Sequence, residues 1–234
     1  MSESLTIVHA FADYGVESEV LSAYGDVHRF TIDPRPNEFV AETVAVDLMD
    51  ETPEIEADLG LFHPKCSRYS EMTSISGDPD DHEDQIPRAR EIARETCDHW
   101  IVENKPNAPL EDPTVLDGKM FGLPIAYARA FETSFPVEAP PRFADLPTEC
   151  STYFSADRSK AWWRSVKGYL GDYPKEHLVK NCLPAAYVHC LVRSWLKTVD
   201  ERDAAVAQDN NGRPPRKTAY DQATLVQAGR EVGR

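Results

Sequence analysis

Short apolar runs that end at polar residues recur along the first hundred residues, and they constrain the fold more than any other feature. Each run has the length of a buried strand and is followed by a turn or by a helical pattern. The runs are Leu5–Phe11, Val27–Ile32, Thr43–Val46, Asp58–Phe62 and Trp100–Val102. Strands that alternate with helices predict an open α/β sheet with right-handed crossovers and helices on both faces.

The segments between and after these runs complete the predicted organisation. Helices are predicted over Glu17–Ala23, Ile86–His99 and 157–171, and over a last segment from Leu183 to about Ala207. Residues 71–87 are acidic and contain glycine and proline, which predicts a mobile loop or lid. Residues 104–147 are rich in proline and glycine and are interpreted as loops with two further short strands. Pro174 marks the expected start of another helix.

Polar side chains stand where four of the predicted strands end. In open α/β sheets, ligands bind at the carboxyl ends of the strands. The residues at or just after those ends are Asp33, Asp47, Cys66 and Glu103. Four polar groups at one edge of a sheet predict a single functional site there.

Cys66 and Glu103 carry the chemistry that we expect of this site. A cysteine is a good nucleophile as a thiolate, and neighbouring positive charge favours that form. His63, Lys65 and Arg68 lie within three residues of Cys66. Glu103 at a neighbouring strand end is then a candidate proton donor. The alternative is that Cys66 is a small core residue, which is the commoner role of a lone cysteine.

Composition narrows the class of protein. At 234 residues the chain is long enough for one large domain with a sizeable core. It has no stretch of the roughly 20 apolar residues that span a bilayer, and the start Met1–Ser4 has no basic region typical of a secretory signal. Five cysteines in no framework spacing predict reduced thiols and a cytoplasmic protein, in the host cytoplasm if the chain is viral. No ligand spacing indicates a metal, so we expect no metal site.

Charge is distributed unevenly. The formal net charge is −15, and the first 150 residues carry most of the acid, whereas residues 151–234 are basic. A surface that binds a polyanion is therefore expected in the C-terminal third. Abundant acid with few lysines also suits a protein from a high-salt organism, so we expect a halophilic origin.

The ordered motifs resemble those of the DNA cytosine-5 methyltransferases, in particular their small phage and archaeal-virus type. Ile101–Leu110 is similar to the Glu-Asn-Val motif and the run after it, and Arg129–Thr133 is similar to the later arginine motif. Pro64–Ser67 stands in the place of the Pro-Pro-Cys-Gln loop. Phe11–Gly15 stands where the first cofactor loop belongs, and Asn181–Ala185 resembles the last motif, Gly-Asn-x-Val-Pro-Pro. The resemblance covers roughly residues 5–195.

This resemblance implies a fold, a reaction and a site. It implies a Rossmann-like, S-adenosylmethionine-dependent methyltransferase sheet with a small C-terminal helical recognition portion. The implied reaction is methylation of cytosine C5 in double-stranded DNA through a covalent cysteine adduct. Cys66 would attack the base, Glu103 would hold and protonate it, and Arg129 would position it. The implied cofactor-binding residues are Phe11, Gly15, Asp33, Asp47 and Asn181.

The chain also departs from the family pattern. Gly15 is the only glycine kept in the first loop, so Asp13, Tyr14 and Val16 place side chains where the backbone would approach the cofactor. Two further readings therefore stand. One is a catalytically degenerate protein of the same fold, acting as a structural or nucleic-acid-associated component, such as a viral one; it expects Tyr14 or its neighbours to fill the cofactor pocket. The other is an unrelated cysteine hydrolase with His63 as its base.

The predicted domain organisation follows from these motifs. Residues 1–207 form the methyltransferase-like domain, with a catalytic loop over 63–87 and a minimal target-recognition portion at about 140–180. Residues 208–234 are expected to form a flexible basic tail. The oligomeric state and the DNA sequence recognised are not specified by any motif.

Overall fold

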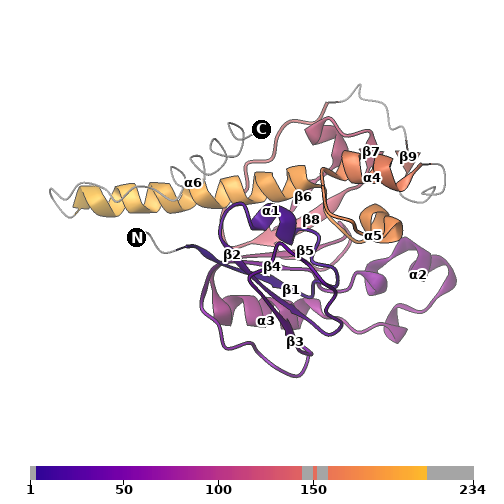
Figure 1. Cartoon of the computed structure of the whole chain (residues 1–234), viewed down its shortest axis with the longest axis horizontal. Coiled ribbons are helices and arrows are strands. Elements are labelled where there is room, and N and C mark those ends of the chain that lie inside the picture. The colour runs from indigo at the N-terminus through magenta and orange to yellow at the C-terminus, as the bar shows by residue number, and fades with distance from the viewer. Residues whose placement is uncertain (1–3, 144–149, 152–157, 210–234) are drawn as a thin grey trace.

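A twisted sheet forms the centre of the molecule (Figure 1). The computed structural model describes residues 4–143, 150–151 and 158–209. Within that part, seven strands pair in the order β3-β2-β1-β4-β5-β8-β6. Strands β1 to β5 run parallel, and β8 is antiparallel to both β5 and β6. The strands are β1 (Thr6–Ala10), β2 (Asp26–Thr31), β3 (Glu42–Ala45), β4 (Ala57–Phe62), β5 (Cys97–Asn104), β6 (Thr114–Leu116) and β8 (Arg129–Thr133).

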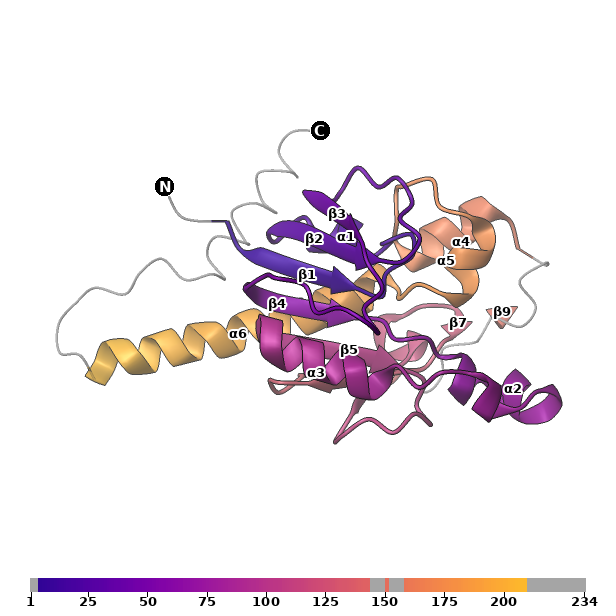
Figure 2. The ribbon, with the colours of Figure 1, turned by 90° about the horizontal axis from the view of Figure 1, so that it is seen from below.

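Helices cover both faces of this sheet, as predicted (Figures 1 and 2). Helix α3 (Ile86–Thr96) packs on one face through Ala89, Ile92 and Ala93, which join the core against β4 and β5. The opposite face is covered by α1 (Ser18–Leu21), α4 (Lys160–Lys167), α5 (Lys175–Lys180) and the N-terminal part of α6 (Ala185–Asp209). The far half of α6 extends past the sheet (Figure 2).

Each face has its own hydrophobic core. The larger core joins the sheet to α1, α4, α5 and α6 and contains the fully buried Trp163, Tyr187 and Trp195. The smaller core lies under α3 and contains Phe62 and Val102. Residues of one strand supply both cores, because successive side chains point to opposite faces. Buried apolar area on both sides is the main force that holds such a sheet together.

The strand order creates a switch point beside β1. From β1 the chain moves outward through β2 to β3, and it then returns to build β4 and β5 on the other side of β1. Loops that leave β1 and β4 therefore diverge at their carboxyl ends, where a crevice opens in sheets of this kind. The segment after β1 and the Cys66 segment after β4 both begin at this crevice.

The smaller elements refine several predictions. Residues 71–87, expected as a loop or lid, contain α2 (Glu71–Ser76) and a 3-10 turn, η2 (Pro79–Asp81). Strand β5 begins at Cys97 instead of Trp100, because its pairing with β4 already starts at Ala57↔Cys97. Helix α4 ends before the predicted residue 171, since Gly168 adopts φ +83° and terminates it.

Remaining elements are short. Two-residue strands β7 (Ile125–Ala126) and β9 (Cys150–Ser151) pair with each other, and 3-10 turns η1 (Ser67–Tyr69) and η3 (Gly118–Phe121) complete the described chain. Parts of the predicted recognition portion, 144–149 and 152–157, lie outside the described residues. Residues 210–234 of the predicted tail also lie outside the described residues. The first two residues of that tail, 208 and 209, belong to α6. Among the helices of the described ranges, none has the length and hydropathy required to cross a bilayer.

Candidate active site

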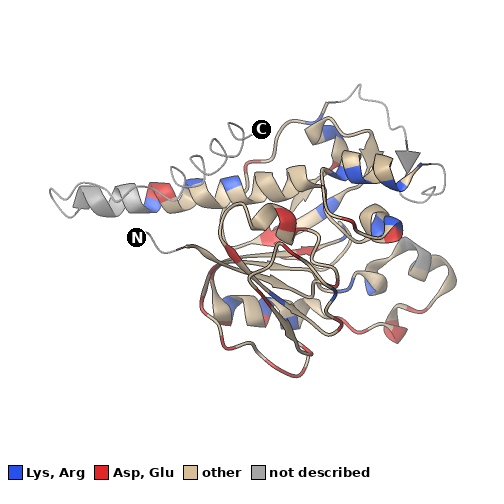
Figure 3. Ribbon diagram, in the orientation of Figure 1, with Lys and Arg blue, Asp and Glu red and all other residues tan. Residues whose placement is uncertain are grey.

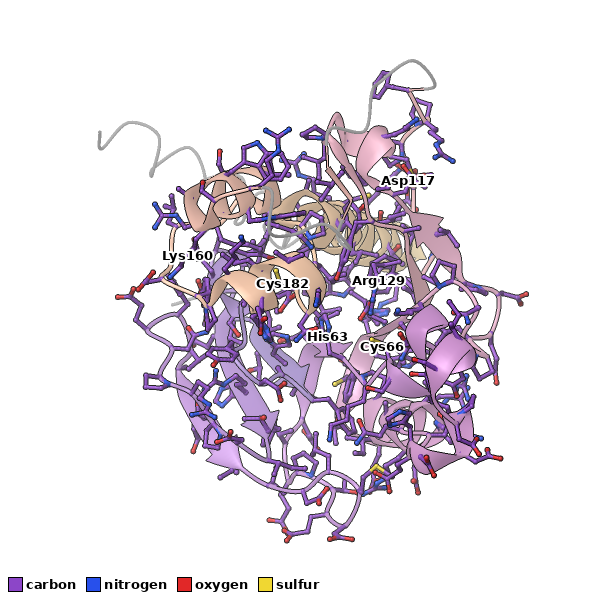
Figure 4. The ribbon with its side chains drawn as sticks, turned by 90° about the vertical axis from the view of Figure 1, so that its right-hand side faces the viewer. His63, Cys66, Asp117, Arg129, Lys160 and Cys182 are labelled. Carbon is purple, nitrogen blue, oxygen red and sulfur yellow. The ribbon has the colours of Figure 1, made fainter. Side chains whose placement is uncertain are left out.

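One cavity of about 430 Å³ opens at the carboxyl ends of β1, β2, β4 and β5. Its volume lies in the range of small-molecule sites, roughly 300–1,000 Å³. All eight residues selected from the sequence line it, although their roles stay predictions. They are Phe11, Gly15, Asp33, Asp47, Cys66, Glu103, Arg129 and Asn181. Figure 4 shows His63, Cys66 and Arg129 close together, with Lys160 and Asp117 well apart from them.

The first loop follows β1 and is held in a defined shape. Gly15 has φ +60°, and a Cβ there would lie 2.6 Å from the Arg29 Cδ atom, so this position requires glycine. Asn37 donates hydrogen bonds to the carbonyl oxygens of Tyr14 (2.9 Å) and Gly15 (2.8 Å). Phe11 has φ +56°, a backbone conformation that costs a non-glycine residue free energy. The loop is therefore ordered although it keeps a single glycine.

Side chains of this loop leave the cavity open. Tyr14 does not line the cavity; its ring packs on His177 with centroids 4.7 Å apart. Val16 is fully buried in the larger core. Asp13 does line the cavity. The degenerate reading expected Tyr14 or its neighbours to fill the pocket, and this arrangement does not match that expectation.

Two carboxylates, from the segments after β2 and β3, line another part of the cavity. Asp33, just after β2, is two-thirds exposed and forms an ion pair with Arg35. Asp47, after β3, accepts a hydrogen bond from the Met49 backbone N–H at 3.0 Å. Both keep oxygen atoms available for a ligand with hydroxyl or amino donors.

The Cys66 loop is held by two side chains from other segments. Asn104 at the end of β5 donates from Nδ2 to the Pro64 carbonyl oxygen at 3.1 Å, and both groups are buried. Gln85 accepts from the Lys65 backbone N–H at 2.9 Å. These bonds hold the C=O and the N–H of the Pro64–Lys65 peptide and so place the half-buried Cys66 at the cavity wall.

The cations near Cys66 in sequence do not all act on it. The Arg68 guanidinium points to the neighbouring turn, where it contacts Asp80 and the carbonyl oxygens of Pro79 and His82. The His63 ring has both nitrogens directed toward carboxylates, and no hydrogen bond joins it to Cys66 within the described residues. Lys65 lines the cavity. This arrangement does not supply the Cys–His pair that the hydrolase reading requires.

Glu103 and Arg129 form a buried ion pair across the β5–β8 pairing. Arg129 Nε donates to Glu103 Oε1, and His63 Nδ1 lies 3.2 Å from Glu103 Oε2. Burial of the carboxyl opposes ionisation, but Arg129 and His63 outweigh it and lower the pKa of Glu103 to about 2. The free protein therefore holds Glu103 as a carboxylate.

A second buried carboxylate, Glu17, lies on the other side of His63. Glu17 accepts a hydrogen bond from the Leu183 backbone N–H at 2.6 Å, which ties the start of α1 to the segment before α6. His63 Nε2 lies 4.0 Å from Glu17 Oε1, and His9 Nε2 lies 3.6 Å from Glu17 Oε2. Burial, with His63, Arg29 and His177 nearby, lowers the pKa of His9 well below its usual value, so that His9 is neutral.

The helical segment closes the cavity from the opposite side. Helix α5 starts after Pro174, as predicted, and contributes His177, Lys180 and the C-cap residue Asn181 to the lining. Beneath this segment, Lys167 is fully buried, donates to the Cys182 carbonyl oxygen at 2.6 Å and lies over the Tyr127 ring. Burial lowers the pKa of Lys167 to about 8.

Sequence reasoning missed several residues of the site. His9, Glu17 and His177 have no local motif. Only tertiary packing brings Glu17 and His177 to the cavity and places His9 behind the cavity wall. Asn104 had a signal, since it adjoins Glu103 in the Glu-Asn-Val-like block. Glu17 stands at the start of a predicted helix, where a glutamate is ordinarily exposed, so its burial could not be read from the sequence.

Comparison with known proteins places the fold. No protein-family model matches the chain, and no curated protein matches it. The structure is similar to the S. pombe Dnmt2 methyltransferase, with 10% identity and a TM-score of 0.56, over 84% of this chain and 99% of that one. It also matches an E. coli protein described as a prophage-encoded DNA modification methyltransferase, at 16% identity and a TM-score of 0.45.

The two likenesses differ in extent. The E. coli match covers 59% of this chain and 51% of that one, so this chain spans about half the length of that protein. The likeness to Dnmt2, over 84% of this chain, confirms the predicted Rossmann-like methyltransferase fold.

Proposed function

We propose that this protein transfers a methyl group from S-adenosylmethionine to C5 of cytosine in DNA. The observation that carries the proposal is the continuity of the cavity. Phe11, Asp33 and Asp47 line one part of it, and Cys66, Glu103 and Arg129 line another. A methyl donor and a base placed in one cavity can bring their reacting atoms together.

The first part of the cavity fits the cofactor. When bound, S-adenosylmethionine supplies an electrophilic methyl group. Asp33 would accept hydrogen bonds from the ribose hydroxyls, as acidic residues after a second strand do in related folds, and Asp47 would contact the adenine amino group. Phe11 would pack against the cofactor, the backbone at Gly15 would face its carboxylate end, and Asn181 would help to close the site. Arg29, beneath the loop and near Asp13, and Lys180 in the cavity wall supply positive charge to this part of the molecule.

The second part fits the chemistry on the base. The Cys66 thiolate forms a bond to C6 of cytosine, and the electron pair released makes C5 nucleophilic. Glu103 would contact N3 and the exocyclic amino group. It is a carboxylate in the free protein, so it would take a proton from solvent as the base binds and pass that proton to N3. Arg129 positions the base oxygen. Transfer of the methyl group to C5 would break its bond to the cofactor sulfur and release the demethylated cofactor. The C5 proton would then leave to solvent, the C5–C6 double bond would re-form as the C6–S bond breaks to return the thiolate, and N3 would return its proton to Glu103.

The target base must leave the DNA duplex to reach this cavity. Lys65 and Lys180 lie at the cavity wall, and basic residues also occur along α4, α5 and α6 (Figure 3). These cations are placed to contact phosphates beside the extruded base.

A degenerate protein of this fold remains the second candidate, because the first loop departs from the family pattern at Asp13 and Tyr14. The position of Tyr14 against His177 favours the enzyme, since it leaves the cavity open.

The direct test is transfer of a labelled methyl group from S-adenosylmethionine to cytosine-containing duplex DNA. We expect incorporation at C5 by the natural protein and a loss on the order of 10³-fold or more in Cys66→Ser. The matched control is Cys190→Ser, a half-buried thiol on α6 outside the cavity. Absence of transfer by a folded protein that binds the cofactor would favour the degenerate reading.

A further inference from the structure

We propose that His9, Glu17 and His63 form a binding site for a divalent transition-metal ion, Zn²⁺ being the first to test. One ligand atom from each of the three side chains lies within 4.8 Å of the others. The residues come from the middle of β1, the residue before α1 and the loop after β4. No spacing along the sequence reveals this set, because only the parallel pairing of β1 with β4 brings His9 beside His63.

The hydrogen bonds of the two rings orient them as metal ligands. His9 Nδ1 lies 2.8 Å from Ser18 Oγ, and His63 Nδ1 lies 3.2 Å from Glu103 Oε2. Metal-binding histidines typically use one ring nitrogen in this way, bonding a hydroxyl or carboxylate that fixes the ring and its tautomer. The other nitrogen, Nε2, then faces Glu17 on both rings. His9 is neutral, whereas Glu17 and Glu103 raise the pKa of His63, so that the metal would displace a proton from the His63 Nε2 atom.

Both Nε2 atoms are buried and have no hydrogen-bond partner among the described residues. His9 is fully buried, and the two Nε2 atoms lie 3.6 and 4.0 Å from the Glu17 oxygens, too far for a hydrogen bond. A buried polar atom without a partner costs free energy. A cation between the three groups would satisfy both nitrogens and the carboxylate together.

The donor set and its dimensions suit zinc. Zinc bonds of about 2.0–2.1 Å in a tetrahedral site place neighbouring ligand atoms about 3.3 Å apart. The separations of the His9 and His63 Nε2 atoms from the Glu17 oxygens, 3.6 and 4.0 Å, are slightly longer than this, so the side chains must move inward to bind the ion. Two imidazoles and one carboxylate form a known zinc donor set, whereas magnesium and calcium prefer oxygen ligands. Glu17 also keeps its bond from the Leu183 N–H, which would support it as a ligand.

The fourth coordination position would face the cavity. Glu17 and His63 line the cavity, whereas His9 lies behind them in the sheet. Water or a carboxylate of a bound ligand could occupy that position. The ion would also link β1, the start of α1 and the Cys66 loop, three segments that surround the cavity. This site does not depend on methyl transfer, so it can be tested by metal binding alone.

The test is equilibrium dialysis of the metal-stripped full chain against Zn²⁺, with bound metal counted by mass spectrometry. We expect one equivalent bound in the natural protein, with affinity reduced at least 100-fold in both Glu17→Gln and His63→Gln. Glu17→Gln keeps an oxygen to accept the Leu183 N–H, which protects the fold. Cobalt provides a second readout: its visible absorption should show low-coordinate nitrogen and oxygen ligands in the natural protein and lose that signature in both variants.

The controls separate this site from other zinc ligands. His28→Gln alters a partly exposed histidine on β2, and Cys66→Ser removes the cavity thiol; both should bind one equivalent unchanged. The proposal is overturned if the folded natural protein binds no stoichiometric zinc. It is equally overturned if Glu17→Gln and His63→Gln retain the natural affinity, or if Cys66→Ser alone abolishes binding.

Discussion

At the scale of single residues, the pair of Glu103 and Arg129 dominates the base-binding part of the cavity. Both side chains are buried, and removal of one partner leaves an uncompensated charge in the interior. We expect Arg129→Met to lower the free energy of unfolding by about 3–5 kcal/mol, measured by urea denaturation. The double variant Arg129→Met/Glu103→Gln should recover part of that loss. A double variant less stable than Arg129→Met would contradict this account of the pair.

Lys167 gives a residue-scale prediction for pH. Burial lowers its pKa to about 8 from 10.5 in the unfolded chain. Between these values the unfolded chain binds more protons than the folded protein, so the Lys167 contribution makes stability rise with pH. Its size is on the order of 3 kcal/mol, obtained from 1.36 kcal/mol per pKa unit. Lys167→Met should lack this contribution.

The measurement is the difference in unfolding free energy between the natural protein and Lys167→Met at pH values from about 7.5 to 10.5. This range spans the pKa of Lys167 in the folded protein and in the unfolded chain. A difference is needed because a thiol that is buried in the folded protein still titrates in this range in the unfolded chain; burial raises the pKa of Cys182 to about 12 from 9.0. Lys160→Met, at the exposed start of the same helix, should show the pH profile of the natural protein. A profile of Lys167→Met that also matches the natural one would show that Lys167 is not a titrating buried group.

Several site residues could be predicted from the sequence because they follow apolar runs. Asp33, Asp47, Cys66 and Glu103 stand at strand ends, and parallel strands bring such ends to one edge. Arg129 and Asn181 came from the family resemblance and could not be derived from local pattern. His9 and Glu17 could not be found in either way, since their burial depends on tertiary packing of α1 against the segment before α6.

At the scale of elements, the Cys66 loop depends on β5 for its position. The Asn104 amide holds the Pro64 carbonyl, so its loss should let the loop move without altering the cofactor part of the cavity. We expect Asn104→Ala to lower the methyl-transfer rate constant by about 10- to 100-fold, since small misplacements of a reacting group have effects of that order. Affinity for S-adenosylmethionine should stay within about twofold.

The control for this variant is Asn107→Ala, which removes a more exposed bond to the carbonyl oxygen of Tyr69, the last residue of η1. It should change the rate much less. Equal rates for Asn104→Ala and the natural protein would show that the loop is positioned by other contacts, such as the Gln85 bond to Lys65.

Elements with strong patterns were predicted well, and those set by tertiary contacts were not. The five parallel strands and the helices α3, α5 and α6 occur where apolar periodicity and Pro174 placed them. Helix α2 was missed because the segment 71–87 that contains it is polar and acidic with glycine and proline, which is typical of a loop. The start of β5 was misplaced because Cys97–His99 resembles the preceding helix in composition, whereas pairing with β4 makes it a strand.

At the scale of the whole molecule, the distribution of charge constrains DNA binding. The net charge of −15 opposes a polyanion, so cations near the cavity must supply the favourable contacts. We expect Lys65→Ala and Lys180→Ala each to weaken DNA binding and to reduce the slope of log affinity against log salt by about 1. Lys197→Ala removes a cation of α6 that is paired with Glu138, and it should leave the slope unchanged. Unchanged slopes in all three variants would place the DNA on another face.

The proposed methyl transfer depends most directly on whether the cavity binds the methyl donor. The decisive measurement is calorimetric titration of the full chain with S-adenosylmethionine and with its demethylated product, in molar salt. We predict one-to-one binding in the micromolar range that is lost in Asp33→Ala and kept in Asp80→Ala, an exposed aspartate outside the cavity. Absence of binding by the folded natural protein would contradict the proposed enzyme and leave a methyltransferase fold with another function.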